Sequence, residues 1–358
     1  MKKVIALVLS VLLLLSVLPT AAFASEKTDE IKAKMEAARD YLYGEKTEFT
    51  AAEGYDFLLY LYAGGNGEKF KDAYVQSVKD AFDAGTMNTA DRVAIAGLCL
   101  EELEVETIPF ELNDGTKVDL REKVKELGVA VDSPYNYFFI KFFVGDNDYL
   151  EQIENALKAD YTAGKGYNYW GFGTDNTANF AAMINDNELK NDAVQVVETA
   201  KTDKGYYYLE EYGTYANGNT TASVLFMYAY LMDLDNGNDS TKADEVYKLL
   251  MDNFSAENGA YAYEAGGAAD NYATRDVLKA LIFYYKSVEA AETPSEEQEK
   301  TTDDAAQKTT AAAEASDAEK TGKQSTPPTG DSLMACGIAG VAVLALGAAL
   351  VMRKKEEK

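Results

Sequence analysis

The sequence contains no histidine, two cysteines and one tryptophan among its 358 residues. Without histidine, a zinc site built from Asp, Cys and His is excluded in that form, and so is a serine nucleophile with a histidine base. Cys99 stands in a central apolar run and Cys336 in a C-terminal segment that we expect to be removed. No disulfide is therefore expected in the mature chain, whose fold must depend on its core.

Basic residues are scarce as well. The 34 Lys and Arg residues against 60 Asp and Glu give a formal net charge of -26. Such a chain repels nucleic acids and other anionic polymers at close range. Partners that recognise a basic patch are excluded, and we expect no nucleic-acid binding.

The N-terminus has the pattern of a secretory signal. Lys2 and Lys3 precede an apolar run over residues 4–18, and small residues stand where a signal peptidase reads them. We predict a signal peptide over residues 1–24, cleaved between Ala24 and Ser25, and hence an exported protein.

The C-terminus has the pattern of a membrane anchor. Residues 333–352 carry no charge, and as a helix they would span about 30 Å, the thickness of a bilayer core. Basic residues follow directly, as they do on the cytoplasmic side of a membrane. We predict a transmembrane helix over residues 333–352 with a basic tail.

The segment before this span, "STPPTGD" at residues 325–331, resembles the sortase sorting signal of Gram-positive surface proteins. The matching residues are Pro327, Thr329 and Gly330, with Thr326 where the commonest pattern has Leu. The resemblance makes residues 326–358 a sorting signal, implies sortase and peptidoglycan as partners, and places the protein on the extracellular face of a Gram-positive cell, bound to the membrane before sorting. The alternative is a plain C-terminal membrane anchor.

Between the two ends the chain divides into a domain and a stalk. Residues 289–325 are rich in Ala, Thr, Glu, Lys, Ser and Pro and lack aromatic residues, so that burial could not offset the entropy of ordering. We predict a disordered stalk there. Residues 25–288 are long enough for one large domain, which we expect to be monomeric.

Two kinds of helix alternate through residues 25–288. The first kind is amphipathic, with apolar residues three or four apart. Its patterns are Ile31, Met35, Ala38 and Leu42; Phe70, Tyr74, Ser77 and Ala81; Val118, Val124 and Leu127; Ile153, Leu157 and Tyr161; Leu189, Ala193, Val196 and Ala200; and Val246, Leu249 and Leu250.

The second kind is apolar on nearly every side. Its six runs are residues 55–62, 93–100, 137–144, 180–184, 224–232 and 277–285. A helix without a polar stripe must be covered all round, so the two kinds should form an inner and an outer layer. Because the first and last apolar helices also need cover, they should meet each other. The pattern predicts an all-α fold, an α6/α6 toroid of six helical hairpins with an inner and an outer ring.

Three stretches repeat a Gly-aromatic turn, a small polar entry and an apolar helix: "GFGTDNTANFAAMI", "YYYLEEYGTYANGNTTASVLFMYAYL" and "GAYAYEAGGAADNYATRDVLKALIFYY". They resemble the α/α toroids of the prenyltransferase and squalene-cyclase type, the terpenoid-cyclase and cobalamin-carrier group. One column of the repeat holds short polar residues that we expect to cap helix starts. They are Asp56, Asp91, Asn136, Asn179, Ser223 and Thr274.

Catalysis of the kinds that the resemblance implies is not expected. Protein prenyltransferases of this type hold zinc with Asp, Cys and His, and its terpene cyclases use an Asp-x-Asp-Asp motif; neither arrangement is present. We therefore expect no metal, no cofactor and no catalytic residue. A pair of loop carboxylates remains open as the basis of a glycosidase or lyase. The candidates are Asp175, Glu210, Glu211, Glu264 and Asp270.

Aromatic residues gather in the three loops that lead into the last three apolar helices. Tyrosine and tryptophan beside glycine suit sugars or flat polar ligands, since each ring offers contact area and one polar group. The candidate ligand-binding residues are Tyr167, Tyr169, Trp170, Phe172, Tyr207, Tyr212, Tyr215, Tyr261 and Tyr263. We expect a non-enzymatic, wall-anchored display protein that binds a ligand such as a glycan; the alternatives are a carbohydrate-active enzyme and a carrier of a cobalamin-like small molecule.

Overall fold

The computed structural model describes residues 26–128, 134–167, 173–208, 215–234 and 240–292. The predicted signal peptide, the sorting signal and residues 293–325 of the stalk lie outside these ranges. Within them, no helix combines the length and apolar character that a membrane span requires. The predicted span over residues 333–352 is not among the residues described.

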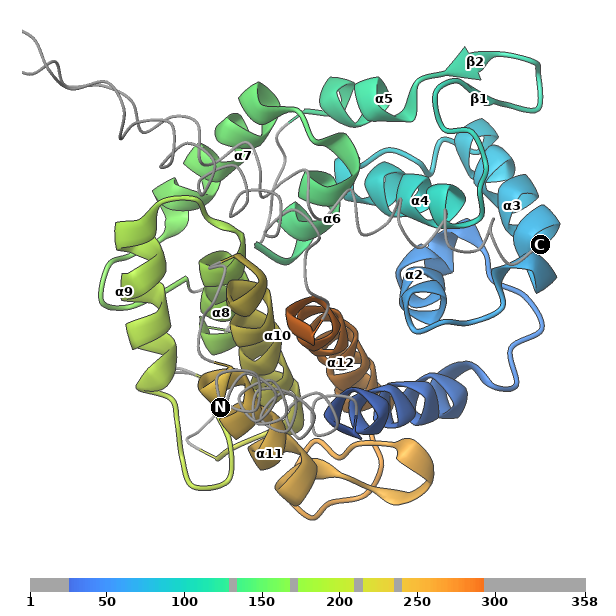
Figure 1. The fold of residues 1–358 in the computed structure, drawn as a ribbon. Coiled ribbons are helices and arrows are strands. Elements are labelled where there is room, and N and C mark those ends of the chain that lie inside the picture. The colour runs from blue at the N-terminus through green and yellow to red at the C-terminus, as the bar shows by residue number, and fades with distance from the viewer. Residues whose placement is uncertain (1–25, 129–133, 168–172, 209–214, 235–239, 293–358) are drawn as a thin grey trace, which may run out of the picture. The chain divides into compact units, whose positions relative to one another are not determined.

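The regular secondary structure of the described residues is almost entirely α-helical, which confirms the all-α prediction (Figure 1). The amphipathic set comprises a helix over residues 26–43, α3 (Lys71–Asp83), α5 (Leu120–Glu126), α7 (Asn147–Asp160), α9 (Asn187–Glu198) and α11 (Thr241–Phe254). The apolar set comprises α2 (Gly54–Tyr62), α4 (Ala90–Glu102), α6 (Pro134–Val144), α8 (Gly173–Met183), α10 (Gly218–Leu234) and α12 (Asn271–Glu292).

The amphipathic helices bury the stripe that their spacing predicted. Ile31, Ile153 and Leu250 are fully buried, whereas the opposite faces of these helices carry exposed charged side chains. In Figure 1, α3, α5, α7 and α9 lie toward the outside of the ribbon, and α4, α6, α8 and α10 lie farther in. A one-sided apolar stripe therefore marks the helices that cover the apolar set.

The apolar helices contact one another in chain order. Helix α2 contacts α4, α4 contacts α6, α6 contacts α8, α8 contacts α10 and α10 contacts α12. Helix α12 also contacts α2, so the first and last members meet, as their apolar character predicted. Each of these helices is thus packed against two others of its own kind.

One amphipathic pattern was assigned too far toward the N-terminus. Val118 lies in the short strand β2 (Lys117–Val118), which pairs antiparallel with β1 (Phe110–Glu111). Helix α5 begins at Leu120 because the Asp119 side chain accepts hydrogen bonds from the backbone N–H groups of the next residues, Arg121 and Glu122. Val118 therefore belongs to a strand, and its spacing from Val124 and Leu127 matches a helix only by chance.

The column of short polar residues does not cap helix starts as predicted. Helices α8 and α10 begin at Gly173 and Gly218, so Asn179 and Ser223 lie well inside them. Asp56 does stand in the first turn of α2, but α2 shows no side-chain cap, and Asp56 accepts a hydrogen bond from the Tyr43 hydroxyl at 2.9 Å. The prediction failed because α8 and α10 begin several residues before this column of the repeat.

The last apolar helix is longer than its run predicted. Helix α12 extends to Glu292, four residues beyond the predicted end of the domain at residue 288. The Ser287 hydroxyl donates to the Ala229 carbonyl of α10 at 2.7 Å, and Val288 is buried. Residues 289–292 have the composition of the stalk, but they are helical because this end of α12 packs against α10.

Candidate functional site

Three loops lead from an amphipathic helix into α8, α10 and α12, and the same contact fixes each loop. In each, a tyrosine backbone N–H donates to a threonine hydroxyl in the helix that follows, at 2.9 to 3.0 Å. The threonine hydroxyl in turn donates to the backbone carbonyl four residues earlier. We call these contacts the Tyr–Thr ties; they join Tyr167 to Thr177, Tyr206 to Thr221, and Tyr261 to Thr274.

Glycine is needed beside two of the ties. Gly166 has a φ of +89°, and a Cβ there would lie 2.4 Å from the Thr177 hydroxyl. Gly205 has a φ of +141°, and a Cβ there would lie 2.5 Å from the Thr221 hydroxyl. Only glycine allows the backbone to turn and the tyrosine N–H to reach the helix.

The ties turn several candidate ligand-binding rings inward. Tyr167 and Tyr261 are each 2% exposed and pack in the core, so they support the loops and offer no surface to a ligand. Tyr207 and Tyr263 are half-buried, and Tyr215 is 48% exposed. The remaining candidates, Tyr169, Trp170, Phe172 and Tyr212, lie outside the described residues.

The five candidate carboxylates also differ in their surroundings. Glu264 is exposed, and Asp270 accepts a hydrogen bond from the Ala273 N–H at the start of α12. Glu210 and Glu211 lie outside the described residues. Asp175, in the first turn of α8, lies near polar groups of α10 and α12, since Asp276, Thr220 and Lys279 all act on its pKa.

Asp175 lies in a group of polar side chains at the N-terminal ends of the apolar helices. We call this group the rim cluster; it consists of Asp175 of α8, Asn219 and Thr220 of α10, Arg275 and Asp276 of α12, and Tyr55 of α2, together with Tyr208, Tyr215 and Tyr263 of the loops. The Asn219 amide donates to the Asp276 carboxylate at 2.7 Å.

Two carboxyl groups of the rim cluster are near enough to influence each other. Burial raises the pKa of Asp175 to about 8, and the charge of Asp276 adds to the rise, while hydroxyls of Thr220 and Ser223 and the Lys279 ammonium oppose it. Burial also raises the pKa of Asp276, against the opposing charge of Arg275. At neutral pH Asp175 is therefore mostly protonated and can donate a hydrogen bond.

Tyrosines connect this acid to the surface. The charge of Asp175 contributes to the raised pKa values of both Tyr208 and Tyr263, although burial is the main cause for each. Tyr263 lies edge-on to Tyr215, with ring centroids 6.3 Å apart. On the other side of the cluster, the Arg275 guanidinium lies 5.2 Å from the exposed ring of Tyr272 and 5.4 Å from that of Tyr55.

Several polar atoms of the rim cluster are buried and have no partner at the distance and angle of an ordinary hydrogen bond. Among the described residues they are Asp175 Oδ1, Asn219 Oδ1, Thr220 Oγ1, Arg275 Nε and the Tyr55 hydroxyl. An unpaired buried polar group costs roughly 1 to 3 kcal/mol, so five at one place represent a large local cost. They comprise donors and acceptors, so any group that satisfied them together would have to both donate and accept hydrogen bonds.

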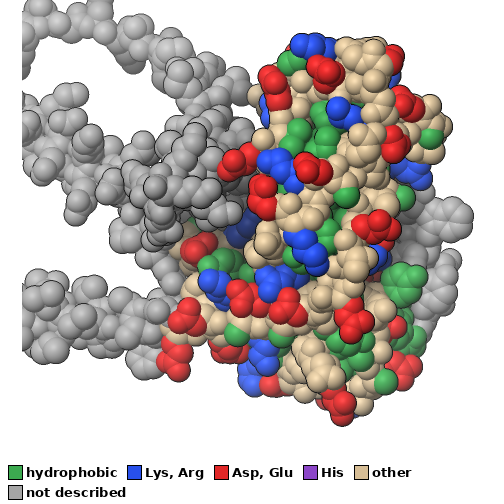
Figure 2. Space-filling view, turned by 90° about the vertical axis from the view of Figure 1, so that its right-hand side faces the viewer, with side chains coloured by type: hydrophobic (Ala, Val, Ile, Leu, Met, Phe, Trp, Pro, Cys, Tyr) green, Lys and Arg blue, Asp and Glu red, His purple; other side chains and the backbone are tan. Residues whose placement is uncertain are grey.

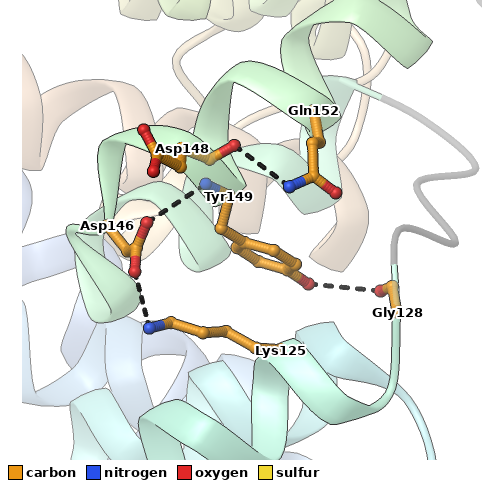
Figure 3. Close-up of a pocket in the computed structure, with 6 residues that line it drawn as sticks. All are labelled: Lys125, Gly128, Asp146, Asp148, Tyr149 and Gln152. Atoms are coloured by element: carbon orange, nitrogen blue, oxygen red, sulfur yellow. Dashed lines mark hydrogen bonds and ion pairs between the residues drawn. The ribbon is translucent and has the colours of Figure 1, made fainter.

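The structure also shows a depression at the surface, between α5 and α7 (Figure 3). Its volume is about 540 Å³, and it is lined by Lys125, Gly128, Asp146, Asp148, Tyr149 and Gln152. Its polar groups already bond one another: Lys125 pairs with Asp146 at 2.6 Å, and the Tyr149 hydroxyl donates to the Gly128 carbonyl at 3.2 Å. This depression has less to offer a ligand than the rim cluster.

Charge on the surface shows no single-sign patch in the view of Figure 2, where acidic and basic side chains are interspersed. Ion pairs such as Lys201 with Glu245 at 2.7 Å and Lys248 with Asp252 at 2.6 Å join neighbouring residues. Within the described ranges, no group of three or more Cys, Asp or Glu residues is placed to hold a metal ion.

Sequence reasoning missed Arg275, Asp276 and Lys279 of α12. A signal was present: Lys279 is a charged residue inside the apolar run over residues 277–285, where no wet face is available to it. Such a charge must be paired or hydrogen-bonded inside the fold. In comparisons with known proteins, no family model and no curated protein matches the chain.

Proposed function

We propose that the chain is a wall-anchored surface protein of Gram-positive bacteria. Its domain is an α6/α6 toroid of the prenyltransferase and squalene-cyclase type, and this domain binds a glycan at the rim cluster without catalysis. The contacts of the apolar helices in chain order, and of α12 with α2, support the toroid. The sorting pattern around Pro327, Thr329 and Gly330 supports wall attachment by a sortase.

The observation that carries ligand binding is the group of unpaired buried polar atoms beside exposed tyrosines. Sugar hydroxyls can donate and accept, and so can satisfy carboxyl, amide and guanidinium groups together, while the faces of Tyr215 and Tyr272 offer stacking area. The half-buried ring of Tyr263 lies near Asp175, and the guanidinium of Arg275 lies beside the ring of Tyr272.

A glycan array probed with the secreted chain tests this function. Saturable binding is expected, and Asn219→Ala should weaken it at least tenfold because two partners of the ligand change: the amide itself and the Asp276 carboxylate that it orients. Asp148→Asn at the surface depression is the matched control and should bind as the unaltered chain does. Binding unchanged by Asn219→Ala in a folded protein would refute the site.

A second function has one observation in its favour. Asp175, protonated at neutral pH beside Asp276, has the character of a general acid paired with a second carboxyl group. If the protein is a glycosidase or lyase, product should accumulate from the bound glycan, and Asp175→Asn should lower turnover far more than it lowers affinity for the glycan. Binding without product over hours supports display alone.

Wall attachment is tested separately. Thr329→Ala removes the residue whose carbonyl a sortase would transfer to a cell-wall amine, so the protein should move from the wall fraction to the membrane fraction of fractionated cells. Thr326→Leu, which restores the commonest form of the pattern, should leave the protein in the wall. A Thr329→Ala protein that stays in the wall fraction would contradict sorting.

A further inference from the structure

Two residues 100 positions apart meet inside the set of apolar helices. Lys279 of α12 is 5% exposed and Asn179 of α8 is 3% exposed. The Lys279 Nζ lies 2.9 Å from the Asn179 side-chain carbonyl oxygen. Nζ thus hydrogen-bonds the amide oxygen, and the carbonyl carbon one bond beyond that oxygen is the atom that an uncharged amine here would attack. Attack would begin once Nζ approaches that carbon to about 3 to 3.5 Å.

The surroundings of Lys279 favour the uncharged amine. Its Nζ lies 4.0 Å from the ring centroid of Phe226, 4.5 Å from that of Tyr135 and 5.4 Å from that of Phe138. Lys279 makes no ion pair with any residue that the structure describes. Burial lowers the pKa of Lys279 to about 7, although Asp276 and Asp175 oppose the change. Much of the amine thus carries a free lone pair at neutral pH.

Two acids stand on the same helix faces as the pair. Asp175 precedes Asn179 by four residues on α8, and Asp276 precedes Lys279 by three on α12, spacings that bring side chains together on a helix. Both acids act on the charge of Lys279, and Oδ1 of Asp175 is buried without a hydrogen bond. The Asn179 amide nitrogen donates to the Asp175 backbone carbonyl at 2.8 Å, which holds the amide in place.

We propose that Lys279 and Asn179 form an intramolecular isopeptide bond, with Asp175 as the proton carrier. The Lys279 nitrogen attacks the side-chain carbonyl carbon of Asn179, a bond forms between them, and the bond from that carbon to Nδ2 breaks. Asp175 protonates the departing nitrogen and takes up a proton from the attacking amine, so that one ammonia molecule leaves and no other reactant is needed. The product joins α8 covalently to α12.

Lys141 provides an internal comparison. It too lies among apolar residues, and burial lowers its pKa to about 8. Its Nζ lies 2.9 Å from a carbonyl oxygen, but this is the backbone carbonyl of Met183 at the end of α8. Attack on that carbonyl would cut the backbone, and Lys141 has no hydrogen bond to a side-chain amide among the described residues. Lys141 should therefore remain unmodified.

Mass spectrometry of the secreted full chain tests the bond. The intact mass should be lower by one ammonia molecule than the mass calculated for the chain after its processing, and a protease digest should contain one branched product joining the peptide of Lys279 to that of Asn179. Lys279→Arg keeps the charge but should restore the full mass, whereas Lys141→Arg should still show the loss. A folded, unaltered chain with the full mass overturns the proposal, and so does a loss of ammonia confined to the Asn179 peptide.

A second variant separates chemistry from folding. Asp175→Asn keeps the size of the side chain and leaves both reacting residues in place, so the protein should fold, as judged by its helical circular dichroism, yet retain the full mass. A folded Asp175→Asn protein that still carries the branched peptide would overturn the role of Asp175. Glycan binding is scored apart from the mass, so failure of one proposal does not decide the other.

Discussion

The first and second halves of the domain hold their apolar helices in different ways. Around α2 the rings of Phe49, Phe57, Phe70 and Tyr74 pack together, with Phe49 and Phe57 stacked at 4.7 Å. Around α8, α10 and α12 the loops are fixed by buried hydrogen bonds, the Tyr–Thr ties. The first half has this aromatic cluster beside α2, whereas the second half has the three Tyr–Thr ties in addition to aromatic contacts of its own, such as Phe226 with Phe283 at 5.0 Å.

This difference has a consequence for function. A loop held by apolar packing must bury its side chains, whereas a loop held by its backbone leaves neighbouring side chains available. The rim cluster accordingly draws most of its members from the second half, on α8, α10 and α12 and their loops, and the first half contributes Tyr55. The repeat is the same in both halves, but the proposed ligand site draws mainly on the second.

The largest effect is expected in the apolar half. Phe57 is fully buried among aromatic neighbours, so Phe57→Ala removes contacts and leaves a cavity that should cost about 3 to 5 kcal/mol of unfolding free energy. Urea denaturation measures the loss. Tyr41→Ala, at a ring 37% exposed, is the control and should change stability by less than about 0.5 kcal/mol. If Phe57→Ala costs as little as the control, aromatic packing does not hold the first half of the domain.

The next effect is expected from a tie. Thr221→Val keeps the shape of a fully buried side chain but leaves the Tyr206 N–H without an acceptor, which should cost about 1 to 3 kcal/mol. Thr221→Ser retains the hydroxyl and should recover most of that loss in the same denaturation experiment. Equal losses in the two variants would show that packing, and not the hydrogen bond, fixes the loop.

A smaller, pH-dependent effect is expected at Glu198 of α9. Burial opposes ionisation there, but hydroxyls of Tyr228 and Tyr206 donate to the carboxylate at 2.7 and 2.9 Å and Lys242 lies nearby, so its pKa is lowered. A lowered folded pKa gives stability that is present above the ordinary value of 4.5 and is lost as the pH falls below it. Glu198→Gln should cost about 1 kcal/mol at neutral pH.

The measurement is the difference in unfolding free energy between the unaltered chain and Glu198→Gln from pH 7 to pH 3. It should shrink on acidification. Glu53→Gln is the counterpart in the first half, where Lys46 and Thr50 lower the pKa of a more exposed carboxyl group, and its effect should be smaller. A difference that grows toward pH 3 would contradict the sign assigned to Glu198.

The smallest effect on stability is expected at the exposed rim. Tyr215→Ala removes a ring that is 48% exposed and touches Tyr263 edge-on, so unfolding free energy should change by no more than about 0.5 kcal/mol. Glycan affinity, by contrast, should fall severalfold because a stacking face is lost. If Tyr215→Ala costs as much stability as Thr221→Val, the Tyr215 ring contributes to the core as the buried tyrosines do.

Much of the fold follows from local pattern. The stripes of Ile31 and Ile153 predicted covering helices, and the unbroken apolar runs predicted helices with no wet face, because helical periodicity is a property of neighbouring residues. The burial of individual loop residues was harder to predict from the sequence. Tyr167 and Tyr215 both lie in aromatic-rich loops, yet one is core and the other surface, since the Thr177 hydroxyl draws only the first inward.

The sequence by itself determined that the domain is helical, which helices cover others, and that no histidine chemistry takes place. Only the tertiary structure decided which polar groups meet. Asp175 and Asp276, like Asn179 and Lys279, lie about a hundred residues apart, and their protonation depends on burial that no local pattern encodes. Spacing along the chain fixes what a helix can bury, but packing between helices fixes which charges share that space.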